Sequence, residues 1–200
     1  MYLYPSWIRI WHWLNALLFL VLIITGISMQ YSNPDVPLIR FDLAVNLHNI
    51  SGVIVTAIYF LFLFGNIFSS NGKYYRINKE NLTDRMKKQY KYYTKGIFND
   101  ADPPFPVTKE RKFNPLQKIT YVVSMYIFMP LIIITGWALL FPEATVDKVF
   151  GTSGLLLTDV FHIIIGFLLS VFMIVHIYFA TISHSPGGNF RAMITGWHVD

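Results

Sequence analysis

Four histidines lie inside or at the edge of long apolar stretches of the sequence: His12, His48, His162 and His176. A strongly polar side chain is costly within hydrocarbon, so residues of this kind in a membrane are usually functional. Neutral imidazole binds haem iron and other transition metals through one ring nitrogen, and its other nitrogen then needs a hydrogen-bond acceptor. The first chemistry to consider is therefore haem or metal ligation within a membrane.

The apolar stretches are long enough to cross a bilayer. Of the 200 residues, 54% are hydrophobic and 14% are charged, whereas about a quarter of an average soluble domain is charged. A spanning helix needs about 20 mainly apolar residues. Four segments satisfy this need, at about residues 11–30, 45–68, 119–141 and 155–182. They predict an all-α fold, an integral membrane four-helix bundle, with residues 1–200 as a single membrane domain.

The first of these segments differs from a signal peptide. Trp11, His12 and Asn15 stand where a cleavable signal is plainly apolar, and Ile27–Gln30 is a poor cleavage site. We therefore expect the segment to remain as a span.

Basic residues concentrate in one connection between the predicted spans. Residues 69–118 hold 12 of the 16 lysine and arginine residues together with five acidic residues, whereas the connections 31–44 and 142–154 hold one basic residue each. Basic connections usually stay in the cytoplasm. We therefore predict that the 69–118 loop and both termini are cytoplasmic. We expect the loop to contact water and anionic membrane lipid, and not nucleic acid.

The four histidines fall at two levels of the predicted bundle. His12 and His176 lie near the cytoplasmic ends of the first and fourth spans, and His48 and His162 lie near the outer ends of the second and fourth. His162 and His176 are separated by 14 positions, which places them on one helix face about 21 Å apart along the axis. Six-coordinate haem iron takes one histidine on each face of its ring. The levels predict two haem b groups, one held by His12 and His176 and the other by His48 and His162.

Four glycines accompany these histidines in a faint internal repeat. Ile24–Gly26 and Ile134–Gly136 share the sequence Ile-Thr-Gly, and both His48 and His162 begin a His-x-x-x-Gly pattern. A missing side chain beside a ligand leaves room for a flat ring. The four positions that we expect to border the cofactors are Gly26, Gly52, Gly136 and Gly166. Ordinary packing of helices through small residues is the alternative.

The absence of cysteine limits the redox chemistry. It excludes disulfides, thiolate-bound iron–sulfur clusters and covalent haem attached to a C-x-x-C-H motif. Zinc is the competing interpretation of the histidines. Two pairs about 21 Å apart cannot form one tetrahedral site, and a two-histidine zinc site would need carboxylates, of which Asp159 is the one nearby. Haem ligation fits the pattern better.

Several segments of the sequence match the motifs of one family of membrane proteins. They are Arg9–Ala16, His48–Gly52, Lys112–Lys118, the His162/His176 pair and Gly188–Gly196. Through these segments the sequence resembles the di-haem cytochrome b subunits of membrane-bound formate dehydrogenases, nickel–iron hydrogenases and thiosulfate-reductase-like complexes. The resemblance covers nearly the whole chain except the centre of the 69–111 segment. It implies the same two axial histidine pairs and a place in the plasma membrane of a prokaryote.

The resemblance also implies a bound quinone, menaquinone or ubiquinone. It would lie close to His176, beside the haem at the cytoplasmic level. Asn114 and Gln117 can supply hydrogen bonds to a quinone carbonyl, and Lys112 and Lys118 add positive charge. Asn114 directly precedes Pro115, so a helix cap is an alternative role that is compatible with the first.

The resemblance further implies that the chain passes electrons between the quinone pool and a partner enzyme. The expected partners are a catalytic subunit and an iron–sulfur or other electron-transfer subunit, with membrane lipid around the bundle. Two alternatives stay open. One is a stand-alone transmembrane haem reductase that passes electrons to an extracytoplasmic acceptor, and the other is a haem-free structural anchor.

Overall fold

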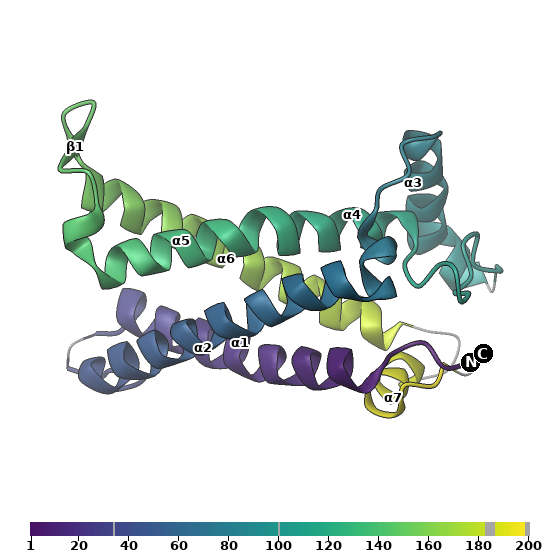
Figure 1. Ribbon diagram of the computed structural model, residues 1–200, viewed down its shortest axis with the longest axis horizontal. Helices are drawn as coiled ribbons and strands as arrows, with labels where there is room; N and C mark the ends of the chain where they lie inside the picture. The colour runs from purple at the N-terminus through teal and green to yellow at the C-terminus, as the bar shows by residue number, and fades with distance from the viewer. Residues whose placement is uncertain (34, 100, 183–186, 199–200) are drawn as a thin grey trace.

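The computed structural model describes residues 1–33, 35–99, 101–182 and 187–198. Four long helices form an elongated bundle (Figure 1), which confirms the predicted all-α membrane fold. They are α1 (Ser6–Tyr31), α2 (Phe41–Phe68), a third span over Pro115–Leu140, and α6 (Gly154–Thr181). Their first residues, 6, 41, 115 and 154, lie before the predicted starts at 11, 45, 119 and 155, because polar and aromatic residues in a first turn lower the hydropathy without stopping the helix.

The third span is irregular at its centre. It consists of α4 (Pro115–Val123), a π-helical turn η4 (Ser124–Phe128) and α5 (Met129–Leu140). Pro130 is the second residue after this turn and has no N–H, so it cannot donate to the carbonyl of Met125. That carbonyl accepts a hydrogen bond from the Tyr59 hydroxyl at 2.9 Å instead. The irregular turn is thus tied to α2.

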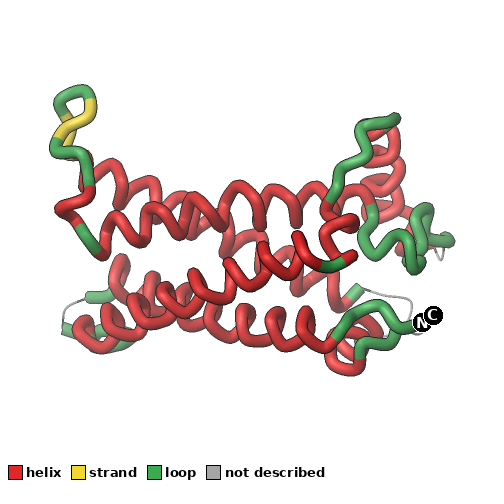
Figure 2. The backbone as a smooth tube through the Cα atoms, viewed as in Figure 1, coloured by secondary structure: helices red, strands yellow, loops and turns green. Residues whose placement is uncertain are grey.

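The two ends of the bundle carry different elements (Figures 1 and 2). Both termini, α3 (Leu82–Lys91) and α7 (Gly188–Thr195) lie at one end, here called the termini end. The antiparallel pair β1 (Lys148–Val149) and β2 (Thr152–Ser153) lies at the other, here called the hairpin end. Short turns complete the chain: η1 (Ser70–Tyr75), η2 (Tyr92–Gly96), η3 (Ile97–Asn99) and η5 (Pro142–Ala144).

The C-terminal helix α7 fastens the start of α1. The Leu3 amide donates to the Gly196 carbonyl at 2.9 Å, and the Trp13 indole N–H donates to the Met193 carbonyl at 3.1 Å. Gly196 has φ 87°, and a Cβ there would lie 2.6 Å from the Tyr2 ring, so only glycine fits this contact. The two ends of the chain therefore position the first turns of α1, which carry His12.

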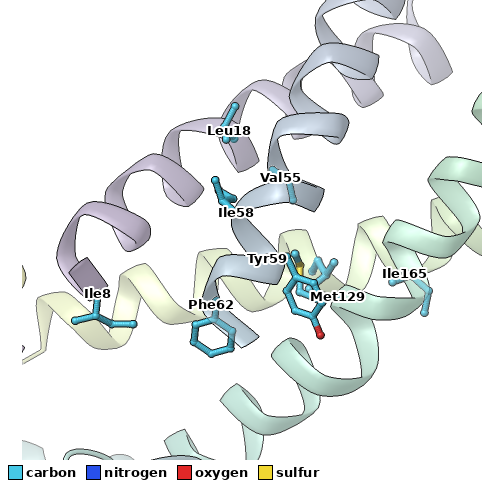
Figure 3. Packing of buried hydrophobic residues seen from close by; sticks show 9 residues of the cluster. Ile8, Leu18, Val55, Ile58, Tyr59, Phe62, Met129 and Ile165 are labelled. Carbon is cyan, nitrogen blue, oxygen red and sulfur yellow. The ribbon is translucent and has the colours of Figure 1, made fainter. Parts of the chain in front are cut away.

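The buried core joins α1 and α2 to α5 and α6 (Figure 3). Its members are Ile8, Leu18, Val55, Ile58, Tyr59, Phe62, Met129, Ile165 and Leu169. The outward faces of the helices stay apolar, since Leu61, Phe167 and Ile174 are 65%, 66% and 65% exposed. Apolar exposure on this scale is unfavourable in water and is normal for surfaces that face lipid.

Candidate functional site

The four histidines meet in two pairs, and α6 contributes one member to each. His12 of α1 faces His176, with ring centroids 6.1 Å apart. His48 of α2 faces His162, with ring centroids 6.3 Å apart. All four side chains are half-buried. The structure thus brings together the same pairs that the predicted levels indicated, the first towards the termini end and the second towards the hairpin end.

The spacing within each pair suits one metal ion between two imidazoles. An imidazole nitrogen binds a transition metal at about 2 Å and lies roughly 1.1 Å from the centre of its own ring. Two rings on opposite sides of one ion therefore have centres roughly 6 Å apart. The observed separations of 6.1 and 6.3 Å agree with this arrangement.

Two threonines hold the imidazoles of His48 and His162. Thr25 Oγ1 lies 2.9 Å from His48 Nδ1, and Thr135 Oγ1 lies 2.9 Å from His162 Nδ1. Each hydroxyl also donates to a backbone carbonyl one turn earlier, that of Val21 or Leu131. A hydroxyl has a single hydrogen, so it must accept from Nδ1–H of the imidazole. Nε2 is then the unprotonated nitrogen of each ring, and it is the one free to bind a metal.

The Ile-Thr-Gly repeat explains how the helices approach these rings. A Cβ at Gly26 would lie 3.6 Å from His48 Cε1, and one at Gly136 would lie 3.3 Å from His162 Cε1. The second distance leaves no room for a methyl group without a shift. The nearest neighbour of each missing side chain is thus the imidazole itself, and each Thr-Gly pair both makes room for a histidine and accepts its hydrogen bond.

The other two glycines open space beside the same histidines. A Cβ at Gly52 would meet nothing within 4 Å, and one at Gly166 would meet only Ile132 Cδ1 at 3.8 Å. Each lies one turn beyond a histidine, on its helix face. The residues present therefore fit a flat macrocycle next to His48 and His162. The roles of all four glycines as haem neighbours stay predictions.

The pair at the termini end is held differently. His176 Nδ1 lies 3.2 Å from the Tyr121 hydroxyl, and Phe172 stacks on the His176 ring. Within the described residues, His12 Nδ1 is buried and has no hydrogen-bond partner, and the same holds for Asn15 Oδ1 one turn further on. The polar atoms around this pair therefore have fewer hydrogen-bond partners than those around the other pair.

Asn114 and Gln117 form a capping box at the start of α4. The Asn114 side chain accepts from the Gln117 amide at 2.9 Å, and the Gln117 side chain accepts from the Asn114 amide at 3.1 Å. The cap that Asn114–Pro115 predicted is confirmed. Asn114 Nδ2 also donates to the Tyr93 hydroxyl at 2.5 Å. Burial raises the pKa of Tyr93, and hydrogen bonds from Asn114 and Gln89 partly offset this rise.

The two lysines near this cap lie in different surroundings. Lys118 Nζ donates to the Arg76 carbonyl at 3.3 Å. Lys112 is only 6% exposed, and its ammonium donates to Asn71 Oδ1 at 3.3 Å and lies 4.2 Å from the centre of the Tyr74 ring. Burial, reinforced by the charge of Lys73, lowers the pKa of Lys112 from 10.5 to about 8.

Several residues of these sites were not singled out by sequence reasoning. The threonines stood inside the repeat, and their recurrence before glycine was the available signal. Tyr121 and Tyr93 gave no signal, because tyrosine near a span end is ordinary in a membrane protein.

Comparison with known proteins identifies the family of this chain. Residues 3–196 match the model of a family described as prokaryotic cytochrome b561. The chain is also 34% identical, over 197 residues, to the Escherichia coli (strain K12) protein named "Putative cytochrome YdhU", covering 98% of this chain and 74% of that relative. No solved structure matches. The chain belongs to the prokaryotic cytochrome b561 family, which confirms the resemblance to membrane cytochrome b subunits.

The family and the paired histidines both point to haem as the cofactor. The family binds haem b, and this chain places imidazoles at the spacing that haem iron requires, with open space beside two of them. The chain is a membrane cytochrome b by family, and its paired histidines are the side chains suited to hold haem.

Proposed function

We propose that this chain is the membrane-anchoring di-haem cytochrome b subunit of a redox complex and transfers electrons between a partner subunit and the quinone pool. The observation that carries the proposal is the presence of two histidine pairs, each spaced for one iron, in a four-span family member. One pair alone would serve a mono-haem protein. Two pairs at different levels provide a path through the bilayer.

Haem b, when bound, supplies an iron that carries one electron at a time. The chain supplies the axial nitrogens, fixes their tautomers at His48 and His162 through Thr25 and Thr135, and keeps water away with the apolar core. The 14-residue separation of His162 and His176 sets the two levels about 21 Å apart. This covers most of a hydrocarbon layer about 30 Å thick.

The proposal places the termini end in the cytoplasm and the hairpin end outside, in the plasma membrane of a prokaryote. The distribution of basic residues supports this, since residues 69–118 hold 12 of 16. A partner subunit then exchanges electrons at the His48/His162 level. Moving one charge across the membrane potential involves about 2.3 kcal/mol per 100 mV, so the potentials of partner and quinone decide the direction.

The quinone is proposed to bind at the termini end, beside His176, Asn114 and Gln117. Support comes from the cap, where the Asn114 and Gln117 amides lie together, and from Tyr93, whose hydroxyl is bound by Asn114. These groups offer hydrogen-bond donors next to apolar rings, as quinone carbonyls require.

The haem content tests the first part of the proposal. The purified chain is expected to contain two non-covalent haem b groups and to give a low-spin reduced spectrum. One haem, or none, per chain in a protein that is fully inserted in the membrane would contradict it. Co-purification with an iron–sulfur subunit would favour a complex over a stand-alone reductase.

The quinone site is tested best by a variant that keeps the cap. Asn114→Ser retains a good capping oxygen and removes the amide donor, so haem content should stay at two. The loss of one hydrogen bond with its partner left unsatisfied costs about 1–3 kcal/mol, or roughly ten- to a hundredfold in the rate of oxidation of reduced haem by a quinone analogue. Unchanged kinetics at full haem content would remove Asn114 from the site.

A further inference from the structure

An open groove of about 410 Å³ lies at the termini end, between the last turns of α2, η1 and the π-helical turn of the third span. Its lining residues are Leu63, Asn66, Ile67, Gly72, Arg76 and Tyr126. Gly72 lets η1 fold tightly against the end of α2, because a Cβ there would lie 2.5 Å from the Asn66 carbonyl oxygen. The groove is therefore a fixed product of the fold, and no described contact assigns it to the histidine pairs.

A chain of buried hydrogen bonds ends in this groove. Lys112 Nζ is 3.3 Å from Asn71 Oδ1, Asn71 Nδ2 is 2.8 Å from Asn66 Oδ1, and Asn66 Nδ2 is 3.1 Å from the Tyr126 hydroxyl. A protonated lysine can only donate, so Asn71 must turn its oxygen to Lys112 and its amide to Asn66. By the same logic Asn66 donates to Tyr126. The chain of donors thus leaves the hydrogen of the Tyr126 hydroxyl free to bind a group in the groove.

The groove is positive, and no acidic residue is among the described residues that line it. Lys112, Asn71 and Asn66 are 6%, 7% and 8% exposed, so the charge of Lys112 is buried at the start of the chain. Among the described residues, Lys112 has no carboxylate within ion-pair distance. Arg76 brings a second cation to the groove wall. Aligned hydrogen bonds polarise one another in a low-dielectric interior, so the buried ammonium strengthens the Tyr126 hydroxyl as a donor.

The position of the groove indicates the kind of molecule that reaches it. Asn66 and Ile67 belong to the last turn of α2, at the level where a span meets the membrane surface, and Ile67 is 71% exposed on the outward face. Tyr126 comes from the π-helical turn of the third span, and such turns often occur at functional sites. Basic pockets at this level of membrane proteins bind anionic lipid head groups.

We propose that this groove binds one anionic phospholipid, with Arg76 and the Tyr126 hydroxyl holding its phosphate. Leu63 and Ile67 contact the first part of an acyl chain. The buried ammonium of Lys112 makes the site selective for a negatively charged head group over a zwitterionic one. The same end of the bundle would then hold two different ligands, a lipid in this groove and a quinone at the capping box.

The test uses the full chain with its cofactors, purified in detergent and titrated with phosphatidylglycerol or with phosphatidylcholine, with bound lipid counted by native mass spectrometry. The wild-type chain should retain one phosphatidylglycerol more tightly than phosphatidylcholine. Arg76→Gln and Tyr126→Phe should each weaken phosphatidylglycerol binding about tenfold. Arg76 is exposed, so its loss leaves folding intact, and Tyr126→Phe keeps the ring contacts with Phe62 and Tyr75.

The matched control is Arg85→Gln, which removes an arginine from α3 outside the groove and should bind lipid as the wild type does. Equal retention of the two lipids, or unchanged binding in both groove variants, would overturn the proposal. So would slower haem oxidation by quinone in Tyr126→Phe with lipid binding unaffected, because the groove would then belong to quinone. Asn114→Ser should leave lipid binding unchanged, so failure of the quinone site and failure of the lipid site are distinguishable.

Discussion

The two histidine pairs have nearly the same spacing but very different support. At the hairpin end, each imidazole is held by a threonine at 2.9 Å, and the two halves of the site are equivalent. At the termini end, the Tyr121 hydroxyl lies 3.2 Å from His176 Nδ1, and His12 Nδ1 has no hydrogen-bond partner among the described residues. The first site follows the internal repeat, since Thr25 and His48 come from α1 and α2, and their counterparts come from α5 and α6.

The difference shows what a repeat can and cannot build. Two similar helical hairpins produce a symmetrical site wherever equivalent residues face each other. The second pair joins the first helix to the last, positions that are not equivalent in the repeat, so its surroundings were free to differ. We therefore expect a rigid, fully hydrogen-bonded site at the hairpin end and a more adaptable one at the end where quinone is proposed to bind.

Removal of a histidine from either pair should have the largest effect on haem content. His48→Ala is expected to abolish one of two haems and His12→Ala the other, because each iron needs both of its axial nitrogens. Haem content and the reduced spectrum measure this. His48→Gly supplied with free imidazole is the control for assembly and should recover the lost component. If both alanine variants lose the same spectral component, the pairing is wrong.

Removal of the threonine acceptors should weaken the site at the hairpin end alone. Thr25→Val or Thr135→Val keeps the side-chain shape but leaves Nδ1–H of a histidine unpaired, and loss of such a partner typically costs ten- to a hundredfold in affinity. A less basic ligand also raises the midpoint potential of that haem, which potentiometry measures separately from stability. Thr158→Val, which loses only a bond to the Gly154 carbonyl, is the control. A potential unchanged from the wild type would show that the threonines only pack.

Lys112 should make stability depend on pH at the termini end. Its pKa is about 8 in the folded chain and 10.5 when unfolded, so the unfolded chain binds more protons between these values. Stability from this group therefore rises with pH from about 8 towards 10.5, by about 1–3 kcal/mol. Thermal unfolding in detergent at pH 7 and pH 9.5 should show this rise in the wild type and lose it in Lys112→Met. Equal pH dependence in both would contradict the burial of the charge.

Tyr121→Phe should have the smallest effect on haem affinity. It tests whether the pair at the termini end depends less on its hydrogen bonds than the pair at the hairpin end. The Tyr121–His176 contact is longer than the threonine contacts, so its loss should lower haem affinity only a few-fold. The ring itself stays in place against Phe113 and Phe172. An effect as large as that of Thr25→Val would mean that the two sites are equally dependent on their hydrogen bonds.

The fold and the histidine pairs could be predicted from the sequence for a physical reason. Membrane spans are set by long apolar runs, and ligands that share a level can be matched by counting along helices. The cap at Asn114 was also visible, because Asn followed by Pro defines a helix start locally. The early starts of the helices were missed, since aromatic and polar first turns resemble interface residues.

The hydrogen-bond partners of the site required the structure. Thr25 satisfies its hydroxyl within its own helix, so apart from its recurrence before glycine nothing in its local sequence marks it as the partner of His48. The buried hydrogen bonds from Lys112 to Tyr126 join residues that are far apart in the sequence. Lys112 and Asn71 are separated by 41 positions, and Asn66 and Tyr126 by 60. Contacts of that range depend on how the helices pack, which periodicity along one helix does not encode.

The place of α6 in both pairs has a consequence for biogenesis. Spans α1 and α2 emerge from the ribosome first with His12 and His48, but each of these is only half of a site. His162 and His176 follow on the last span. Under the proposed ligation, no haem can therefore gain two ligands until that span has been inserted. On the same proposal, a chain truncated or stalled before Gly154 would carry no complete site, and cofactor loading would report that α6 has been inserted.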